Sequence, residues 1–410
     1  MSLTLFGILW ILIVAYFLCT KRISMMFYLT IFSMVFQCNN IVLIGSIGVG
    51  PQLFTSFAFI IKSFLLIKTP RRQKTILFFL LSLFFFYLII NLIKNGIIGS
   101  KLMDMIQLFI YLICTYRIYK CGNLITEGTF LKFTTCLIKF MVVVSIIQYM
   151  ATIGLIPRQL LTPLLFNDTS EYIYFHHPEI YQRVLGTFME PSYCAAFLVG
   201  SFYYIFHLRK HVKQYKLLLF ALFIEIILTR SSTGYGTFCI IGFAYFCTFM
   251  DRSLLKLTIP VVLVILVFFF VFKDSLLNEV IFNKVESESG LNRGYQDARA
   301  INTFVENPIY GKGYKEVRAS SFATTILAEL GLIGTAIYLI FILAIIWPIF
   351  KKGNYTDYNI AARLLLFAVF ISQLVAIPDI QFSVFWLSLY LLSASINLRN
   401  SQLAHIELLK

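Results

Sequence analysis

The sequence predicts an all-α, polytopic integral membrane protein, and three observations support this fold class. Of the 410 residues, 59% are hydrophobic and only 13% are charged, whereas soluble domains are about half apolar and about a quarter charged. Runs such as residues 217–228 and 257–272 are apolar on every face of a helix, as lipid-embedded segments are. The runs do not show the alternation of apolar and polar residues that is typical of barrel strands. Lipid provides no hydrogen-bond partner for unpaired backbone N–H and C=O groups, so the spans are expected to be helical.

About twenty apolar residues cross a bilayer as a helix, and on this scale the chain contains roughly thirteen spans, within a range of about 12–14. The first group of spans lies near residues 2–19, 23–44, 52–68, 75–93, 102–119 and 133–156. The second group lies near residues 192–208, 217–230, 236–250, 257–273, 322–349, 359–377 and 381–397. Asparagine, serine and glycine interrupt the stretches 23–44 and 217–250.

The formal net charge of +15 first suggests nucleic acid as a partner, but the positions of the basic residues indicate a different cause. They flank apolar runs at alternate helix junctions and do not interleave with exposed aromatics, so no nucleic-acid role is expected. The positive-inside rule instead places these junctions in the cytoplasm, with an outside N-terminus and an inside C-terminus. The basic residues concerned are Lys21, Arg22, Lys68, Arg71, Arg72, Lys74, Arg117, Lys120, Arg209, Lys210, Lys213, Lys216, Arg252, Lys256, Lys351 and Lys352.

Two long polar segments break the pattern of short connections, and both face outside under this topology. They divide the chain into N-terminal transmembrane helices (1–156), a first outer loop (157–192), central transmembrane helices (193–273), a second large outer loop (274–321) and C-terminal transmembrane helices (322–410). The two loops contain more than half of the 19 acidic residues. Loops of this length are usually functional or disordered, and their aromatic content argues against disorder. Short surface helices are expected within them.

Metal and cofactor sites are not expected from the sequence. The eight cysteines lie mostly within apolar runs and form no CxxC pair, which supports neither a disulfide framework nor a thiolate metal site. His176 and His177 are adjacent, a poor spacing for joint metal ligation, and no HExxH pattern supplies partners.

The first constellation that could carry chemistry is the run from Arg183 to Ser192, which leads directly into an apolar helix. Pro191 suits the first helical position, where its missing N–H costs nothing. Glu190 then lies at the cap, with its carboxylate beside the positive end of the helix dipole. Taken alone, this pattern favours a simple capping role. The outer membrane face and the nearby Arg183 keep a functional role open.

The second constellation is Thr229-Arg-Ser-Ser-Thr-Gly234, between two apolar runs near the outer face. Arg230 could simply extend its charged end to the membrane surface. Alternatively, its guanidinium and the hydroxyl of Ser231 form a site for an anionic group, because arginine offers a planar donor fork that suits phosphate oxygens. Both interpretations stay open.

The third constellation combines Ser289-Gly-Leu-Asn-Arg293 with the turn-forming run from Asn307 to Tyr314. Arg293 and Asp297 are four residues apart and could pair on one helix face. Residues 290–304 are typical of an amphipathic helix on a membrane surface, closed by turn residues. The Gly-Lys-Gly run lacks the spacing of a Walker loop, so nucleotide binding is not supported.

Among the charged residues inside predicted spans, four are candidate functional residues, because an ionised side chain there is costly unless it is paired or faces water. They are Asp104, Lys139, Glu225 and Glu329. For Asp104 and Glu225 a helix-packing pair is the expected role, and proton coupling in a transporter is the alternative.

Taken in order, these constellations resemble the O-antigen polymerase and ligase superfamily of bacterial membrane glycosyltransferases. The resemblance covers mainly residues 183–345. Its motifs are Gly186-Thr-Phe-x-Glu-Pro-Ser192, Thr229-Arg-Ser-Ser232, Ser289-Gly-x-x-Arg293, Asn307-Pro-Ile-Tyr-Gly-Lys-Gly313 and Glu329-Leu-Gly-Leu-Ile-Gly334. Before residue 183 the resemblance is one of helix number only.

The resemblance implies an enzyme that joins undecaprenyl-diphosphate-linked glycans on the outer side of the bacterial cytoplasmic membrane. Ligases of this superfamily carry a histidine late in the large loop, but the corresponding stretch here, residues 315–321, has none. This difference favours a Wzy-type polymerase of polysaccharide repeat units over a ligase. A lipid-linked oligosaccharide flippase or transporter is the main alternative from another class, although no internal repeat is evident. A scaffold protein would leave the two motif-bearing loops unexplained.

The implied chemistry displaces a diphosphate from an anomeric carbon. Arginines can stabilise the charge on such a leaving group, and Arg183 and Arg293 are the catalytic candidates for this role. Glu190 is the candidate base for the attacking hydroxyl, with Asp297 and Glu306 as rivals. The expected substrate-binding residues are Arg230, Ser231, Asp297, Lys312 and Tyr314. The implied partners are the lipid-linked donor and acceptor, the bilayer, a chain-length regulator and a flippase.

Overall fold

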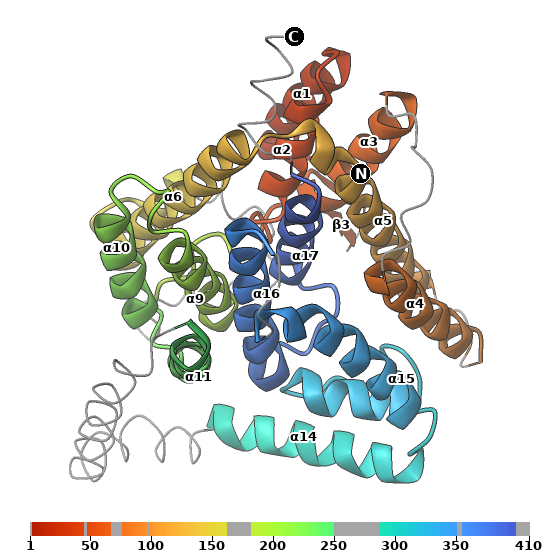
Figure 1. Cartoon of the computed structure of the whole chain (residues 1–410). Helices are drawn as coiled ribbons and strands as arrows, with labels where there is room; N and C mark the ends of the chain where they lie inside the picture. Colours follow the sequence, from red (N-terminus) through yellow and green to blue (C-terminus); the bar gives the residue numbers. More distant parts are fainter. Residues whose placement is uncertain are drawn as a thin grey trace, which may run out of the picture.

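The computed structural model describes residues 2–44, 47–66, 76–94, 96, 99–161, 182–249, 288–350 and 355–398, and these are mostly helical (Figure 1). The N-terminal helices are α1 (Leu5–Cys19), α2 (Ile23–Ser33), α3 (Pro51–Leu66), α4 (Ile76–Lys94), α5 (Gly99–Cys121) and α6 (Glu127–Thr152). The remaining helices are α9 (Pro191–His207), α10 (Tyr215–Leu228), α11 (Ser232–Phe249), α14 (Glu288–Glu306), α15 (Phe322–Ile346), α16 (Asp357–Ala376) and α17 (Ser383–Ile396). Short 3-10 turns are η1 (Gly122–Leu124), η2 (Arg158–Leu160) and η4 (Trp347–Ile349).

The helices pack around a buried centre formed by α9, α16 and α17 (Figure 1). Helices α1–α5 lie on one side of this centre, and α6, α10 and α11 lie on the other. The central helices are buried nearly all round: α17 has buried side chains at almost every position. Their apolar faces point in every direction, which matches the uniform hydrophobicity that the sequence showed.

The structure confirms a helical membrane protein in outline. Within the described residues, four stretches are long and apolar enough to cross a bilayer: Lys101–Cys121, Glu127–Thr152, Phe322–Ile349 and Asp357–Ala376. Shorter apolar helices are Leu5–Cys19, Ile23–Ser33, Pro51–Leu66, Phe78–Lys94 and Ser383–Ile396. The predicted span near 257–273, residues 162–181 of the first outer loop and residues 274–287 of the second outer loop lie outside the described residues. The predicted number of about thirteen spans stays a prediction.

The predicted helix over residues 23–44 is wrong in its second half. Helix α2 ends at Ser33, and a small antiparallel sheet follows, with the strand order β1 (Ser2–Leu3), β2 (Val42–Ile44), β3 (Ile47–Val49). The helix does not continue because the backbone after Ser33 forms hydrogen bonds with a distant segment of the chain. Thr187 donates its hydroxyl to the carbonyl of Val35, and the carbonyl of Thr187 accepts the amide of Cys38 at 3.3 Å. The fold is therefore not strictly all-α.

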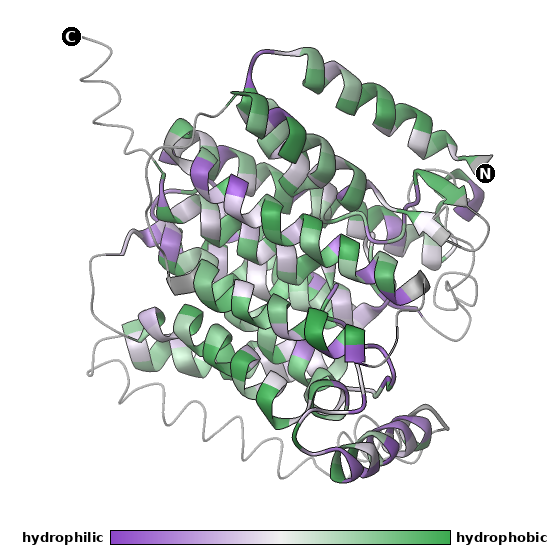
Figure 2. Cartoon of the chain, turned by 90° about the vertical axis from the view of Figure 1, so that its right-hand side faces the viewer, coloured by the Kyte–Doolittle hydropathy of each residue, from purple (hydrophilic) through white to green (hydrophobic). Residues whose placement is uncertain are grey.

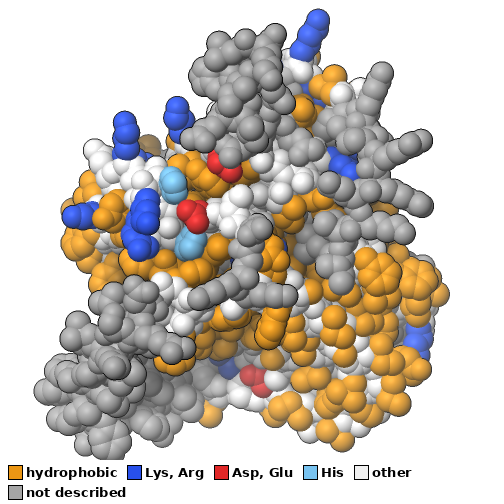
Figure 3. Space-filling view, in the orientation of Figure 1, with side chains coloured by type: hydrophobic (Ala, Val, Ile, Leu, Met, Phe, Trp, Pro, Cys, Tyr) orange, Lys and Arg blue, Asp and Glu red, His pale blue; other side chains and the backbone are white. Residues whose placement is uncertain are grey.

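The connections gather at two opposite ends of the bundle. We call one the basic end: residues 208–216 between α9 and α10, with the start of α16. There His211 Nε2 lies 3.4 Å from Asp357 Oδ2, and Figure 3 shows basic side chains gathered over one part of the surface, with an extended apolar area elsewhere. We call the other the loop end: residues 182–190, 229–231, 307–321 and 377–382. Since α9 runs from the loop end to the basic end over 17 residues, about 25 Å separates the two.

Helix α14 confirms the predicted amphipathic helix over 290–304 and extends it slightly at both ends. It packs along α15 (Figure 1) and is the most hydrophilic helix at the edge of a bundle that is mostly hydrophobic (Figure 2). Ala300 joins Val317, Ala319 and Ala328 in a small apolar cluster beneath it. Small side chains at this contact allow α14 and the following loop to lie close to α15.

Candidate functional site

A buried loop carries the first predicted constellation. Residues 182–190 pass through the bundle, and most of their side chains are buried. Gln148 Oε1 accepts hydrogen bonds from the backbone amides of Leu185 at 2.7 Å and Gly186 at 3.2 Å. Gly186 has a φ of 61°, and a Cβ there would lie 2.8 Å from Ser145 Oγ. This path therefore requires glycine, and the loop forms a rigid support for the residues at its two ends.

Glu190 occupies the end of this loop as the N-cap residue of α9, with Pro191 at the first helical turn, as predicted. Its carboxylate makes no capping bond to the helix backbone. Instead, Ser192 donates its hydroxyl to Glu190 Oε2 at 3.1 Å. The side chain is only partly buried, so a capping role does not occupy this carboxylate. The carboxylate lies at the N-terminal end of α9, beside the positive end of the helix dipole.

Arg183 and Arg230 lie near each other although 47 positions separate them in the sequence. The amide of Val184 donates to the carbonyl of Leu228 at 3.1 Å, which aligns the start of the buried loop with the end of α10. Both arginines lie close enough to the hydroxyl of Tyr235 to act on it electrostatically. The structure therefore brings together two arginines from different predicted constellations.

Arg230 and Ser231 form the tight connection between α10 and α11. Arg230 has a left-handed φ of 47°, and its side chain is exposed. Ser231 is buried, and its Oγ accepts the amide of Gly234 at 3.3 Å, so this hydroxyl caps the start of α11. A Cβ on Gly234 would lie 2.7 Å from the Cβ of Ala195. The first turns of α9 and α11 are therefore in contact, which places Glu190 and Ser231 at the same end of the bundle.

Two glycine motifs of the sequence join in a backbone lock, which we define as residues 308–313 paired with residues 328–333. Helix α15 breaks at Gly331, where φ is 64° and ψ is −166°. The amide of Lys312 donates to the carbonyl of Ala328 at 2.8 Å, and the amide of Leu332 donates to the carbonyl of Pro308 at 2.8 Å. A Cβ on Gly331 would lie 2.5 Å from the amide nitrogen of Gly311. Only glycine allows this approach.

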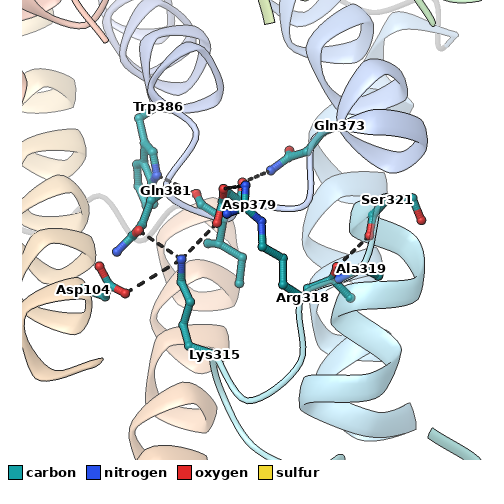
Figure 4. Close-up of polar contacts among 11 residues, drawn as sticks. Asp104, Lys315, Arg318, Ala319, Ser321, Gln373, Asp379, Gln381 and Trp386 are labelled. Atoms are coloured by element: carbon teal, nitrogen blue, oxygen red, sulfur yellow. Dashed lines mark hydrogen bonds and ion pairs between the residues drawn. The ribbon is translucent and has the colours of Figure 1, made fainter. Parts of the chain in front are cut away.

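Beyond the lock, Lys315 lies in a cluster of charged side chains (Figure 4). Its Nζ is 2.9 Å from Asp379 Oδ1 and 3.8 Å from Asp104 Oδ2. Arg318 Nη2 is 3.7 Å from Asp379 Oδ2. Burial works against the charge on Lys315, but Asp379 and Asp104 outweigh it and raise the pKa of Lys315. We call these four residues the Lys315 cluster.

The Lys315 cluster is adjacent to the first turn of α9. The rings of Tyr193 and Phe382 contact each other, with centroids 5.0 Å apart. Tyr193 is three residues after Glu190, and Phe382 is three residues after Asp379. Gln373 Nε2 also donates to the carbonyl of Asp379 at 2.6 Å, which fixes the connection between α16 and α17. This contact places the first turn of α9, with Glu190 at its start, next to the α16–α17 connection that carries Asp379.

The predicted residues on α14 do not join this group. Arg293 is exposed on the first half of the helix. Asp297 does not pair with Arg293 but accepts hydrogen bonds from the hydroxyl of Thr324 at 2.7 Å and from the amide of Ser320 at 3.1 Å. Burial opposes charge on this carboxylate, yet the hydrogen bonds from Ser320 and Thr324 lower the pKa of Asp297. Asp297 therefore fastens α14 to the start of α15.

The remaining predicted binding residues differ in accessibility. Lys312 is exposed beside the lock, and Glu306 is exposed at the end of α14. Tyr314 is 1% exposed, and its amide donates to Asn91 Oδ1 of α4 at 2.7 Å. In this conformation its ring cannot stack on a sugar at the surface, so the expected role of Tyr314 would require the loop to open.

The charged residues predicted within spans differ in their burial and in their partners. Asp104 faces Lys315, and the carboxylate of Glu329 lies near the backbone amide of Lys315. Lys139 is exposed. Glu225 is buried in α10, and within the described part of the chain neither of its carboxylate oxygens has a hydrogen-bond partner. The expected helix-packing pair for Glu225 is therefore not found there.

Sequence reasoning missed Lys315 and Asp379 as partners. Residues 315–321 match no motif that singles out Lys315, and Asp379 falls in a connection of a few residues between two predicted spans. The cost of Asp104 and Glu329 within the membrane was the one available signal, because a buried acid needs a cation nearby.

Comparison with known protein families, with curated proteins and with solved structures found no match. The chemistry of the loop end therefore has to be inferred from its own side chains. Two arginines, the carboxylate of Glu190 and the Lys315 cluster lie at the same end of the bundle.

Proposed function

We propose that this chain is a membrane glycosyltransferase that polymerises undecaprenyl-diphosphate-linked oligosaccharide repeat units on the outer face of the bacterial cytoplasmic membrane. The observation that carries the proposal is that Arg183, Arg230 and Glu190 all lie at the loop end, on the side opposite the basic end. Under the positive-inside rule the basic end faces the cytoplasm, which puts these three residues outside.

The reaction needs a base and a stabilised leaving group. A hydroxyl oxygen of the acceptor sugar attacks the anomeric carbon of the donor, and the bond from that carbon to the diphosphate oxygen breaks. The hydroxyl proton passes to the carboxylate of Glu190, which has no capping bond to compete with this role. The departing diphosphate carries the negative charge, and the guanidinium groups of Arg183 and Arg230 bind it.

The other predicted residues have supporting roles in this proposal. Arg293, exposed on α14, contacts the diphosphate or the glycan from the outer side. Lys312 is also exposed, so it is accessible to the diphosphate or the glycan from the same side. Ser231 shapes the Arg230 turn through its cap bond to Gly234 rather than by binding substrate.

The test uses purified full-length protein in nanodiscs with a lipid-linked repeat unit, followed by gel analysis of product length. The proposal predicts chain growth, its loss in Arg183→Ala and Glu190→Gln, and a strong reduction in Arg293→Ala. Arg299→Ala is the matched control, because Arg299 is also exposed on α14, and it should leave product length unchanged.

Other outcomes would assign a different function. Transfer of the glycan to an acceptor lipid without chain growth would indicate a ligase. Movement of the intact lipid-linked glycan across the bilayer without new bonds would indicate a flippase. Full product length in Arg183→Ala and Arg293→Ala would remove the arginine mechanism.

A further inference from the structure

Two acidic side chains are buried among the residues that the structure describes, and they differ in their surroundings. Glu329, which is 5% exposed, lies near the backbone amide and the side chain of Lys315. Glu225, which is 2% exposed, has no hydrogen-bond partner for either carboxylate oxygen within the described part of the chain. A buried carboxylate without a partner is strongly disfavoured, so Glu225 holds a proton.

Glu225 lies where α10 packs on α6 and α9, beneath the buried loop of residues 182–190 (Figure 1). The thiol of Cys194 on α9 lies close enough to interact with it electrostatically. Ser145 Oγ on α6 faces the same thiol, which is a weak hydrogen-bonding group, and it has no other partner among the described residues. A Cβ at Gly186 in the loop would lie 2.8 Å from Ser145 Oγ and 3.6 Å from Cys194 Sγ. Two polar groups that lack strong partners therefore lead from Glu225 toward the loop.

No ion pair compensates a charge on Glu225 among the described residues. Of the described side chains on α6, α9 and α11, which pack on α10, Cys194 is the titratable group that interacts with it. The neighbouring arginines of the loop end, Arg183 and Arg230, act on Tyr235 but not on this carboxyl. Burial therefore keeps the proton on Glu225.

The position of Glu225 along α10 brings it closer to the loop end than to the basic end. Its carbonyl accepts the amide of Thr229 at 2.9 Å, in the last turn of the helix. Along the helix axis it lies about 6 Å from Thr229 and about 15 Å from Tyr215, so its shorter way to water leads to the loop end. Ser201 Oγ on α9 is likewise buried without a hydrogen-bond partner among the described residues, but Ser201 lies beyond Cys194 on the side of the basic end.

We infer that Glu225 is a proton-binding site within the membrane part of the protein, and that its proton exchanges with water at the loop end past Cys194 and Ser145. The burial of the carboxyl, its lack of a partner and the two polar groups beside it support this site. An ionised Glu225 acts on Cys194, which lies against the loop that joins Arg183 to Glu190. Proton binding at Glu225 requires no glycan, so it stands or falls independently of the proposed function.

The first experiment treats the full-length protein in phosphatidylcholine nanodiscs, near neutral pH, with dicyclohexylcarbodiimide, a hydrophobic reagent that modifies protonated carboxyls. The carboxyl proton passes to one nitrogen of the reagent, the carboxylate oxygen bonds to its central carbon, and the adduct rearranges to an N-acylurea that retains all atoms of both. We expect mass spectrometry to find this adduct on Glu225. Glu306 is the matched control, because it is exposed at the end of α14; it should stay unmodified by this reagent and react instead with a water-soluble carbodiimide.

The second experiment follows the infrared carbonyl stretch of the protonated carboxyl, defined as the band that is lost in Glu225→Gln, which keeps the shape of the side chain. Transfer from ordinary water to heavy water should shift this band, because the proton exchanges. Ser145→Ala should slow the shift about fivefold, since it removes the hydroxyl beside Gly186. Ser201→Ala is the matched control, because it removes an equally buried hydroxyl on the side of the basic end, and it should leave the rate unchanged.

Four results would overturn the inference. Absence of both the adduct and the band would show that Glu225 is ionised. Protection of Glu225 from the reagent by sodium ions at constant pH would assign the site to a metal cation rather than a proton. A band that never shifts in heavy water would show a proton locked in place with a structural role alone, and slowing by Ser201→Ala but not by Ser145→Ala would place the exchange at the basic end. The adduct is mapped on the unsubstituted chain, so a variant that fails to fold leaves this test in force.

Discussion

The two ends of the bundle both carry charge, but they hold it in different ways. At the basic end, Asp357 is 57% exposed and faces His211 across 3.4 Å, and the neighbouring lysines extend into solvent. At the loop end, the side chains of Lys315 and Asp379 are 29% and 27% exposed and lie 2.9 Å apart. The lock between residues 308–313 and 328–333 fixes the backbone just before Lys315, and the hydrogen bond from Gln373 fixes the backbone at Asp379. The basic end has the charge needed for orientation, and the loop end has the fixed geometry that a binding site requires.

The largest effect is expected from replacing Gly331 by alanine, because this substitution disrupts the lock that fixes the backbone at the loop end. A Cβ would lie 2.5 Å from the amide of Gly311, in a left-handed backbone, so we expect a loss of roughly 3 kcal/mol or more in the free energy of unfolding. Thermal unfolding in detergent measures it. Gly236→Ala is the matched control, because a Cβ there meets nothing within 4 Å. Equal stability of the two variants would show that the lock is not a fixed element.

The next largest effect on stability is expected from replacing one acidic residue at each end of the bundle. Asp379→Asn leaves Lys315 and Arg318 without their shared partner, and we expect a loss of roughly 1–3 kcal/mol. Asp357→Asn, at the exposed basic end, should cost less than about 1 kcal/mol. Chemical denaturation of both variants checks the order, and a reversal of it would contradict the proposed difference between the ends.

A smaller effect is expected from pH. The pKa of Asp297 is lowered in the folded protein, so its contribution is present above about pH 4, its unfolded value, and is lost as pH falls through the lower folded value. The pKa of Lys315 is raised, so its contribution is present below about pH 10 and is lost only above its higher folded value. Hydrogen exchange of residues 307–321 should therefore be constant from about pH 5 to 7, after correction for the intrinsic rate. Loosening of this loop between these limits would show that other groups hold it.

The smallest effect is predicted at the basic end. Exchanging Lys210 and Lys213 for glutamine should change stability by less than about 0.5 kcal/mol, because both are exposed charges. Product length in the nanodisc assay should stay the same. A shortened product would mean that the basic end takes part in the reaction.

The helices could largely be predicted from the sequence, because long apolar runs indicate segments that are buried in lipid or in the helix bundle. The expected spans near 52–68 and 359–377 correspond to α3 and α16 within two residues at each end. The error at 23–44 has a tertiary cause: Thr187, more than 140 residues away, takes the backbone partners that a helix would use. No local pattern reveals such a contact.

The candidate site was predicted in part. The cap position of Glu190 follows from the Glu-Pro order, and the structure agrees. The proximity of Arg183 and Arg230 depends on the bond between Val184 and Leu228, and the contact of Lys315 with Asp379 joins residues 64 positions apart. Conversely, Asp297 does not pair with Arg293, which is exposed on the same helix. Its carboxylate instead accepts hydrogen bonds from Ser320 and Thr324.

The central claim is that the loop end faces outside and the basic end faces the cytoplasm. Its most direct test is labelling of single cysteines with a membrane-impermeant maleimide in intact cells, in a background without the eight native cysteines. We predict that Ser232→Cys and Lys312→Cys are labelled in intact cells, whereas Lys210→Cys is labelled only after permeabilisation. Labelling of Lys210→Cys from outside, with protection of the other two, would contradict the account.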